Sequence, residues 1–110
     1  MSWVRGDIVI AALSGDYGKP RPCLVIQSDL FPSLHSVTVC PLTTDLRPDL
    51  PLVRISVSPT EGNGLQVPSQ IATDKINTVT VNRITKRIGA LGEVEMAQVT
   101  RAIAVFLGIV

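Results

Sequence analysis

The chain has 110 residues, which is enough for a single domain over residues 1–110 with a hydrophobic core of its own. A formal charge of +1 at pH 7 excludes the strongly basic composition of proteins that coat nucleic acid nonspecifically. Only 17% of the residues are charged, against about 25% in an average domain. Because monomers seldom expose large apolar patches, this composition indicates that a partner or a second copy covers part of the surface.

The termini contain no expected membrane or export signal. Arg5 and Asp7 interrupt the N-terminal residues MSWVRGDIVI, which therefore lack the apolar core of a signal peptide. The longest apolar run, at residues 102–110, is far shorter than the roughly 20 residues that span a bilayer. We therefore expect a cytoplasmic protein with no membrane partner.

The first half of the chain predicts three strands. DIVIAA at residues 7–12, the run at 22–27 and SVTVCP at 36–41 are rich in β-forming residues and are bounded by turn residues. The connection SDLFPSLHS between the second and third strands has room for one helical turn, with Ser28 or Asp29 as its N-cap.

The second half predicts three more strands, at residues 52–57, 70–76 and 85–91. In LVRISV the alternation places Leu52, Arg54 and Ser56 on one face of the strand. Six short strands separated by turn clusters predict a small barrel or a curled sheet.

An amphipathic helix is expected from Glu93 to about Gly108, because the apolar residues there recur every three or four positions. Its expected inward face consists of Met96, Val99, Ile103, Phe106 and Leu107. Its expected solvated face carries Glu95, Gln98 and Arg101.

Cysteine and histidine chemistry is not expected. Cys23 and Cys40 lie singly in two strand-like runs, and His35 is the one histidine in the sequence, so a metal site or a Cys–His nucleophile is improbable. The two thiols could form a disulfide on paired strands, but buried free cysteines suit a cytoplasmic chain better. We give His35 no catalytic role and assign Trp3 to the core or to an interface.

Arg21 is the first candidate for chemistry, because Pro20 and Pro22 stiffen the backbone on both sides of a guanidinium suited to phosphate. Taken alone, a solvated surface arginine is the better interpretation. Thr43 and Thr44 follow the third strand, where a hydroxyl either donates to a phosphate oxygen or stabilises its own turn. Antiparallel pairing of the second and third strands would bring Arg21 and Thr43 to the same edge of the sheet.

The remaining polar candidates have simpler interpretations of equal or greater weight. Lys19 adds positive charge near Arg21, and Asp16 and Tyr17 are either ordinary turn residues or, for the tyrosine, a platform for base stacking. Asp74 and its neighbour Lys75 are either a surface ion pair or contacts to a ligand.

Five stretches of the sequence carry a family resemblance. GDIV, GDYGKPRPCLVIQSD, PLTT, QIATDKIN and RIGALGEVEM occur in this order over nearly the whole chain, and in these stretches the sequence resembles the MazF/PemK family of bacterial toxin endoribonucleases. The resemblance implies a mainly β fold with a C-terminal helix, an SH3-like barrel of the CcdB/MazF type that assembles as a homodimer. It also implies a second partner, a cognate antitoxin whose disordered C-terminal segment folds over the toxin.

The reaction that the resemblance implies is cleavage of single-stranded RNA at a short motif, with no metal and no cofactor. The 2′-hydroxyl attacks the adjacent phosphate and leaves a 2′,3′-cyclic phosphate and a 5′-hydroxyl end. Arg21 and Thr43 match the family's catalytic Arg-Pro and Pro-x-Thr motifs, as a stabiliser of the pentacoordinate charge and a donor to a non-bridging oxygen. Contacts to the RNA are expected from Asp16, Tyr17, Lys19, Thr44, Gln70, Asp74 and Lys75.

The general base stays open at this point, because a guanidinium is a poor base at neutral pH. Many members carry a Glu-Gln pair in the loop where this chain has Asp16 and Tyr17 at a shorter spacing. Some members also carry an arginine two residues before the aspartate that matches Asp74, and here that position is Ala72.

Two other functions remain as alternatives. A toxin of the same fold could inhibit gyrase by binding it and cut nothing. A small SH3-like binding module with no activity is the default expectation when the fold is the only evidence.

Overall fold

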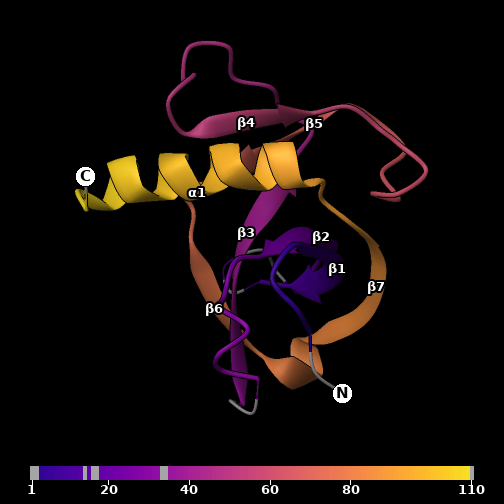
Figure 1. Ribbon diagram of the computed structural model, residues 1–110. Helices are drawn as coiled ribbons and strands as arrows, with labels where there is room; N and C mark the ends of the chain where they lie inside the picture. Colours follow the sequence, from indigo (N-terminus) through magenta and orange to yellow (C-terminus); the bar gives the residue numbers. More distant parts are fainter. Residues whose placement is uncertain (1–2, 14, 16–17, 33–34, 110) are drawn as a thin grey trace.

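The computed structural model describes residues 3–13, 15, 18–32 and 35–109. In this part of the chain the strands form the main body of the fold, and an α-helix follows the last of them (Figure 1). The elements are β1 (Asp7–Ala12), β2 (Pro20–Val25), β3 (Ser36–Thr43), β4 (Arg54–Val57), β5 (Ser69–Ala72), β6 (Asn77–Thr80), the 3-10 helix η1 (Val81–Arg83), β7 (Ile84–Ala90) and α1 (Glu93–Leu107).

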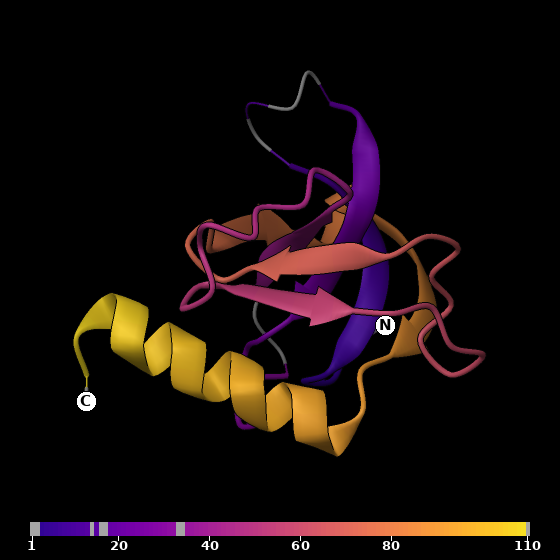
Figure 2. The same ribbon diagram turned by 90° about the horizontal axis from the view of Figure 1, so that it is seen from above.

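The strands form one curled antiparallel sheet. Its order is β4-β5-β3-β2-β1-β7, and β6 pairs with the first half of β3. Helix α1 runs across the sheet beside β4 in Figure 1, and Figure 2 shows β4 and β5 side by side above the rest of the sheet. The mainly β fold with a C-terminal helix is as the sequence predicted.

Strand β2 begins two residues earlier than expected, because Pro20 already pairs with Ala12 of β1. The strand expected at residues 70–76 is confirmed only as far as Ala72. Strand β5 ends at Ala72, and the chain turns at Thr73, whose backbone N–H and hydroxyl both donate to the Val53 carbonyl, at 3.0 and 2.6 Å. The chain then enters β6, a strand that the sequence analysis did not separate.

The helical turn expected in the connection after β2 is wrong for its described part. Ser28 and Asp29 instead stabilise a non-helical turn. The Ser28 hydroxyl accepts from the Leu30 N–H at 3.1 Å, and the Asp29 carboxylate accepts from the Arg5 N–H at 2.7 Å.

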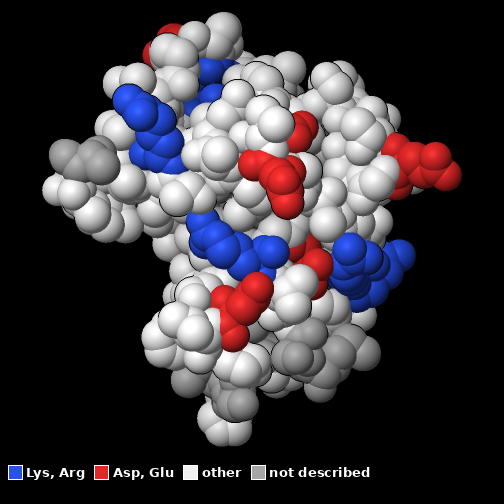
Figure 3. Space-filling model, in the orientation of Figure 1, with Lys and Arg blue, Asp and Glu red and all other residues white. Residues whose placement is uncertain are grey.

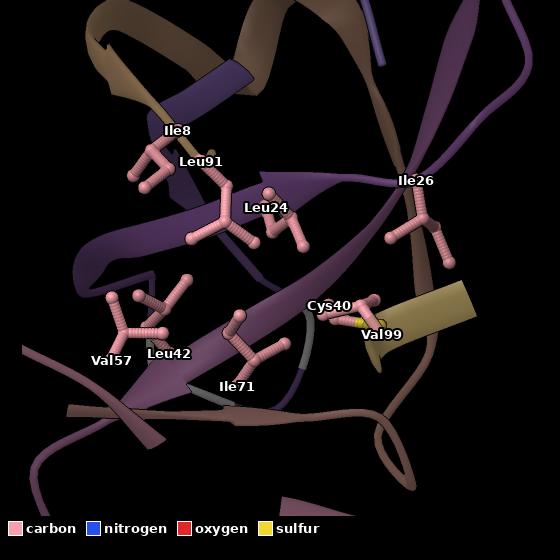
Figure 4. Close-up of a cluster of buried hydrophobic side chains, with 9 residues drawn as sticks. All are labelled: Ile8, Leu24, Ile26, Cys40, Leu42, Val57, Ile71, Leu91 and Val99. Atoms are coloured by element: carbon pink, nitrogen blue, oxygen red, sulfur yellow. The ribbon is translucent and has the colours of Figure 1, made fainter. Parts of the chain in front are cut away.

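The side chains of the sheet form two hydrophobic clusters, and neighbouring residues of a strand belong to different ones, as alternation in a strand requires. The first cluster lies between the strands and α1, and Figure 4 shows Val99 of the helix beside Cys40 of the sheet. It consists of Ile8, Leu24, Ile26, Cys40, Leu42, Val57, Ile71, Leu91 and Val99. The second consists of Val9, Ala11, Leu13, Cys23, Val25, Val37, Val39, Val79 and Ile84, with Trp3 packed against it.

Helix α1 begins at the expected residue and ends in a left-handed turn at Gly108, with φ 72°. Val99 is buried, and Met96 and Ile103 pack against the core, as predicted. Phe106 and Leu107 were expected to face inward, but they are 48% and 53% exposed, because the last turns of the helix extend beyond the sheet (Figure 1). No helix in the described part of the chain is long and apolar enough to cross a membrane.

The two cysteines are buried and form no disulfide with each other, which confirms the sequence-based expectation. They belong to opposite clusters, so their side chains point to opposite faces of the sheet. Burial raises the pKa of the Cys40 thiol to about 12. We therefore expect no alkylation of Cys40 by iodoacetamide at pH 8 in the folded protein and rapid alkylation in urea, measured by peptide mass spectrometry. Modification of native Cys40 at the rate seen in urea would contradict this burial.

Candidate active site

Arg21 and Thr43 lie at one edge of the sheet. In the antiparallel register of β2 and β3, Cys23 is opposite Pro41, and two residues nearer the edge the same register leads to Arg21 and Thr43. Both residues line one cavity of about 320 Å³, which we call the Arg21 cavity. It is lined by Leu13, Gly15, Arg21, Pro41, Thr43, Asp45, Arg54, Ala72 and Lys75.

The Arg21 cavity is locally positive although the whole chain is nearly neutral. Three of its lining residues are cations, namely Arg21, Arg54 and Lys75, and Asp45 is the one carboxylate among the lining residues given above. On the face shown in Figure 3, basic and acidic groups lie close to one another, without one large patch of a single sign. Within the described ranges no three His, Cys, Asp or Glu side chains gather as a metal site would require. The cavity thus offers fixed cations suited to binding an anion.

The Thr43 side chain is held in place by its own turn. Its Oγ1 accepts a hydrogen bond from the Asp45 N–H at 3.0 Å. A hydroxyl that accepts one bond still carries a proton to donate, so the turn and a bond to a substrate oxygen are compatible. The turn therefore fixes the direction in which Thr43 can donate.

A second, smaller cavity of about 230 Å³ adjoins the first, because both include Arg21 and Thr43. It also contains Lys19 and Thr44, two of the residues expected to contact RNA. The structure therefore brings four of the predicted site residues together at this edge, and a fifth, Lys75, lines the first cavity.

The ion pair of Asp74 has a partner that the sequence analysis missed. Arg54 donates to the carboxylate through Nε at 2.9 Å and Nη2 at 3.3 Å, in place of the neighbouring Lys75. These hydrogen bonds hold the pKa of Asp74 below its usual value. The sequence placed Arg54 in an alternating strand, which was the one indication of its position. It did not indicate the partner, because Asp74 lies 20 residues away in the sequence.

The predicted contact Gln70 is not among the lining residues of either cavity. Gln70 is 6% exposed at the centre of β5, and its Oε1 accepts from the Arg47 N–H at 2.8 Å, so this oxygen already has a protein donor. Asp16 and Tyr17 lie outside the described residues. Contacts of these three residues with RNA remain predictions.

The lowered pKa of Asp74 makes a stability contribution that depends on pH. Because the folded-state pKa lies below the unfolded value of about 3.9, the contribution is complete well above pH 4 and is lost as pH falls through the folded pKa. We expect Asp74→Asn to lower the urea midpoint at pH 7 and to lose that difference as pH falls through the folded-state pKa of Asp74. A difference that stays constant from pH 7 to pH 2.5 would show that the Arg54 pair does not stabilise the fold.

Comparison with solved structures defines the class of protein to which this fold belongs. The structure superimposes on the Mycobacterium tuberculosis toxin MazF-mt6 with a TM-score of 0.79 and 31% identity, over 93% of this chain and 96% of that one. It also matches an endoribonuclease in complex with its cognate antitoxin from a mycobacterial species, with a TM-score of 0.81 over 98% and 97% of the two chains. At 20% identity this second match shows the fold alone. The barrel is therefore of the CcdB/MazF type, as predicted.

Sequence comparison then identifies the family. The chain is 49% identical over 106 residues to the probable endoribonuclease MazF of Mycolicibacterium smegmatis, covering 96% of each. The model of the PemK-like, MazF-like toxins of type II toxin–antitoxin systems matches residues 4–107. The chain belongs to this toxin family, which confirms the resemblance seen in the motifs and does not favour the gyrase inhibitor or the inactive module.

Proposed function

We propose that the chain is a toxin endoribonuclease that cleaves single-stranded RNA at a short sequence motif without a metal ion. The observation that carries the proposal is the meeting of Arg21 and Thr43 in one cavity at the edge of the sheet. A guanidinium and a hydroxyl held on neighbouring strands supply directed donors to a phosphate group, and Lys75 adds positive charge.

In the proposed reaction one bond forms, one bond breaks and one proton is transferred overall. The 2′-oxygen of the RNA forms a bond to phosphorus, the bond from phosphorus to the 5′-oxygen breaks, the 2′-hydroxyl loses its proton, and the leaving 5′-oxygen gains one. The Arg21 guanidinium stabilises the charge that develops on the non-bridging oxygens, and the Thr43 hydroxyl donates to one of them. A guanidinium is a poor base, so we assign the deprotonation of the 2′-hydroxyl to a different group.

Neighbouring residues extend the site along the RNA. Lys19 and Thr44 share the second cavity with Arg21 and are suited to flanking phosphates, as donors. The Asp74 carboxylate, oriented by Arg54, can accept hydrogen bonds from the amino groups of an unstacked base. The first loop, with Asp16 and Tyr17, and Gln70 are proposed as further contacts.

The proposed partners are an antitoxin and a second copy of the chain. A structurally similar endoribonuclease is solved with its cognate antitoxin. The end of α1 and the loop before β4 expose Leu52, Phe106 and Leu107, each by about half or more, and a contact between two copies would cover such surface. Because its substrate is cellular RNA, we propose that the toxin acts in the bacterial cytoplasm.

The test is cleavage of single-stranded RNA by the purified protein in EDTA, with the products identified by mass spectrometry. We expect 2′,3′-cyclic phosphate and 5′-hydroxyl ends, and no cleavage of a matched RNA with a 2′-deoxy nucleotide at the cleaved position. Sequencing the 5′-hydroxyl ends from cells that express the protein gives the recognition motif. Intact RNA together with inhibited DNA supercoiling would instead support the gyrase inhibitor, and intact RNA with no toxicity would support a binding module.

A further inference from the structure

Arg54 is placed differently from the two other arginines whose ion pairs lie within the described residues. Its side chain is 10% exposed, whereas Arg47 and Arg87 in their pairs are 45% and 50% exposed. It lies at the start of β4 directly opposite Ala72 of β5, and residues opposite each other in an antiparallel pair share a face of the sheet. Both residues line the Arg21 cavity, and the small side chain of Ala72 leaves room for the guanidinium.

Asp74 fixes the Arg54 guanidinium but does not occupy all of its hydrogen-bond donors. Its Nε and Nη2 donate to Asp74, while Nη1 has no hydrogen-bond partner among the described residues. Every buried side-chain nitrogen and oxygen in the described part of the chain has a partner, so Nη1 is open to solvent. A fixed guanidinium with open donors therefore forms part of a cavity wall that also contains Arg21 and Thr43.

We propose that Arg54 binds a backbone phosphate of the RNA that flanks the phosphate held by Arg21 and Thr43. The proposal rests on the RNA-cleaving function proposed above. Asp74 orients the guanidinium before the substrate arrives, so little side-chain entropy is lost on binding. Arg54 contributes to RNA binding and not to the chemical step, because in the proposed mechanism Arg21 and Thr43 already donate to the attacked phosphate.

A phosphate contact has two signatures that a structural ion pair lacks. Each phosphate neutralised on a single strand contributes about 0.7 to the slope of log affinity against log salt concentration. Loss of such a contact weakens binding almost equally for all sequences, because phosphates carry no base information.

The experiment compares Asp74→Asn with the double variant Arg54→Gln/Asp74→Asn, so that the guanidinium is removed where the carboxylate is already neutral and no unpaired charge is left. The probe is an RNA oligonucleotide containing the cleaved sequence with a 2′-deoxy nucleotide at the cleaved position. We expect the double variant to bind several-fold more weakly, with a salt slope shallower by about 0.7 and an unchanged ranking of RNA sequences.

The matched control is Arg47→Gln/Asp49→Asn, which removes an Arg–Asp pair of the same geometry on the exposed surface and is expected to leave the slope unchanged. If Asp74→Asn and the double variant have equal salt slopes while the wild-type protein cleaves RNA, the role proposed for Arg54 is wrong. The proposed function would then still stand. Wild-type protein that neither binds nor cleaves RNA would overturn the proposed function itself.

Circular dichroism checks that each variant is folded. If the double variant unfolds, Arg54→Lys/Asp74→Asn takes its place, because lysine keeps the charge but not the planar set of donors. That variant is expected to bind RNA more weakly than Asp74→Asn with the same salt slope. Equal affinity for the two would also overturn the proposal.

Discussion

Arg21→Lys is expected to lower kcat for RNA cleavage by about 10²- to 10³-fold while the protein stays folded. Lysine keeps the positive charge of this cavity residue but loses the planar array of donors that can hold two phosphate oxygens at once. Single-turnover cleavage of a labelled RNA at saturating protein measures this step, and thermal melting measures the fold. A variant that cleaves at the wild-type rate would remove Arg21 from the mechanism.

Matched variants distinguish the effect of the Arg21 side chain, the effect of the Thr43 hydroxyl and any loss of stability. Arg47→Lys changes an exposed arginine that does not line the Arg21 cavity, and it should cleave at the wild-type rate. Thr43→Ser keeps a hydroxyl at the strand end and should retain most activity, whereas Thr43→Val should lose it. Because Thr43 also accepts a bond from Asp45, equal melting temperatures for these two variants are needed to assign the loss to the reaction.

Gly89→Ala is expected to destabilise the fold by about 3 kcal/mol, near the upper end for overpacked sites. A Cβ atom at Gly89 would lie 2.4 Å from the Asn63 carbonyl carbon and 2.6 Å from the Gly62 oxygen. The loop cannot easily move away, because the Ala90 N–H donates to Gly62 and the buried Asn63 amide donates to the Ser58 carbonyl. Urea unfolding should show a lower midpoint.

The control for this prediction is Gly62→Ala in the same loop. A Cβ atom there would have the Thr60 hydroxyl as its nearest neighbour at 3.9 Å, an ordinary contact distance. We expect its urea midpoint to stay close to that of the wild type. A similar small effect at Gly89 would mean that the loop at residues 62–63 adapts to β7 more readily than its hydrogen bonds indicate.

The strands and the helix could be predicted where local sequence pattern alone determines them. Strand β1 follows from its β-forming residues and helix α1 from its apolar periodicity, and both begin at the expected residue. The break between β5 and β6 was not predictable, because Thr73 turns the chain by bonding to Val53, which is remote in the sequence, without a nearby glycine or proline. The exposed Phe106 shows the same limit, since periodicity defines a helix face but not how far the sheet extends beneath it.

Some residues of the site could likewise be predicted from the sequence, and others could not. The meeting of Arg21 and Thr43 needed only antiparallel pairing of two consecutive strands, which is the usual arrangement for neighbours in the sequence. Arg54 was missed because its role depends on the pairing of β4 with β5 and on the small residue opposite it. Gln70 was chosen from residue type, and its burial follows from a position in the centre of β5 that sequence alone did not define.

The pairing of β1 with β7 has a consequence for how the protein is made. Asp7 lies opposite Ala90, so a strand formed by the first residues stays unpaired along one edge until nearly all of the sheet has left the ribosome. Residues 13–75, which supply the walls of the Arg21 cavity, are made earlier, before the sheet is complete. For the proposed RNase, synthesis would thus delay activity until β7 emerges, and a nascent chain halted before residue 84 would leave the cell's RNA uncut.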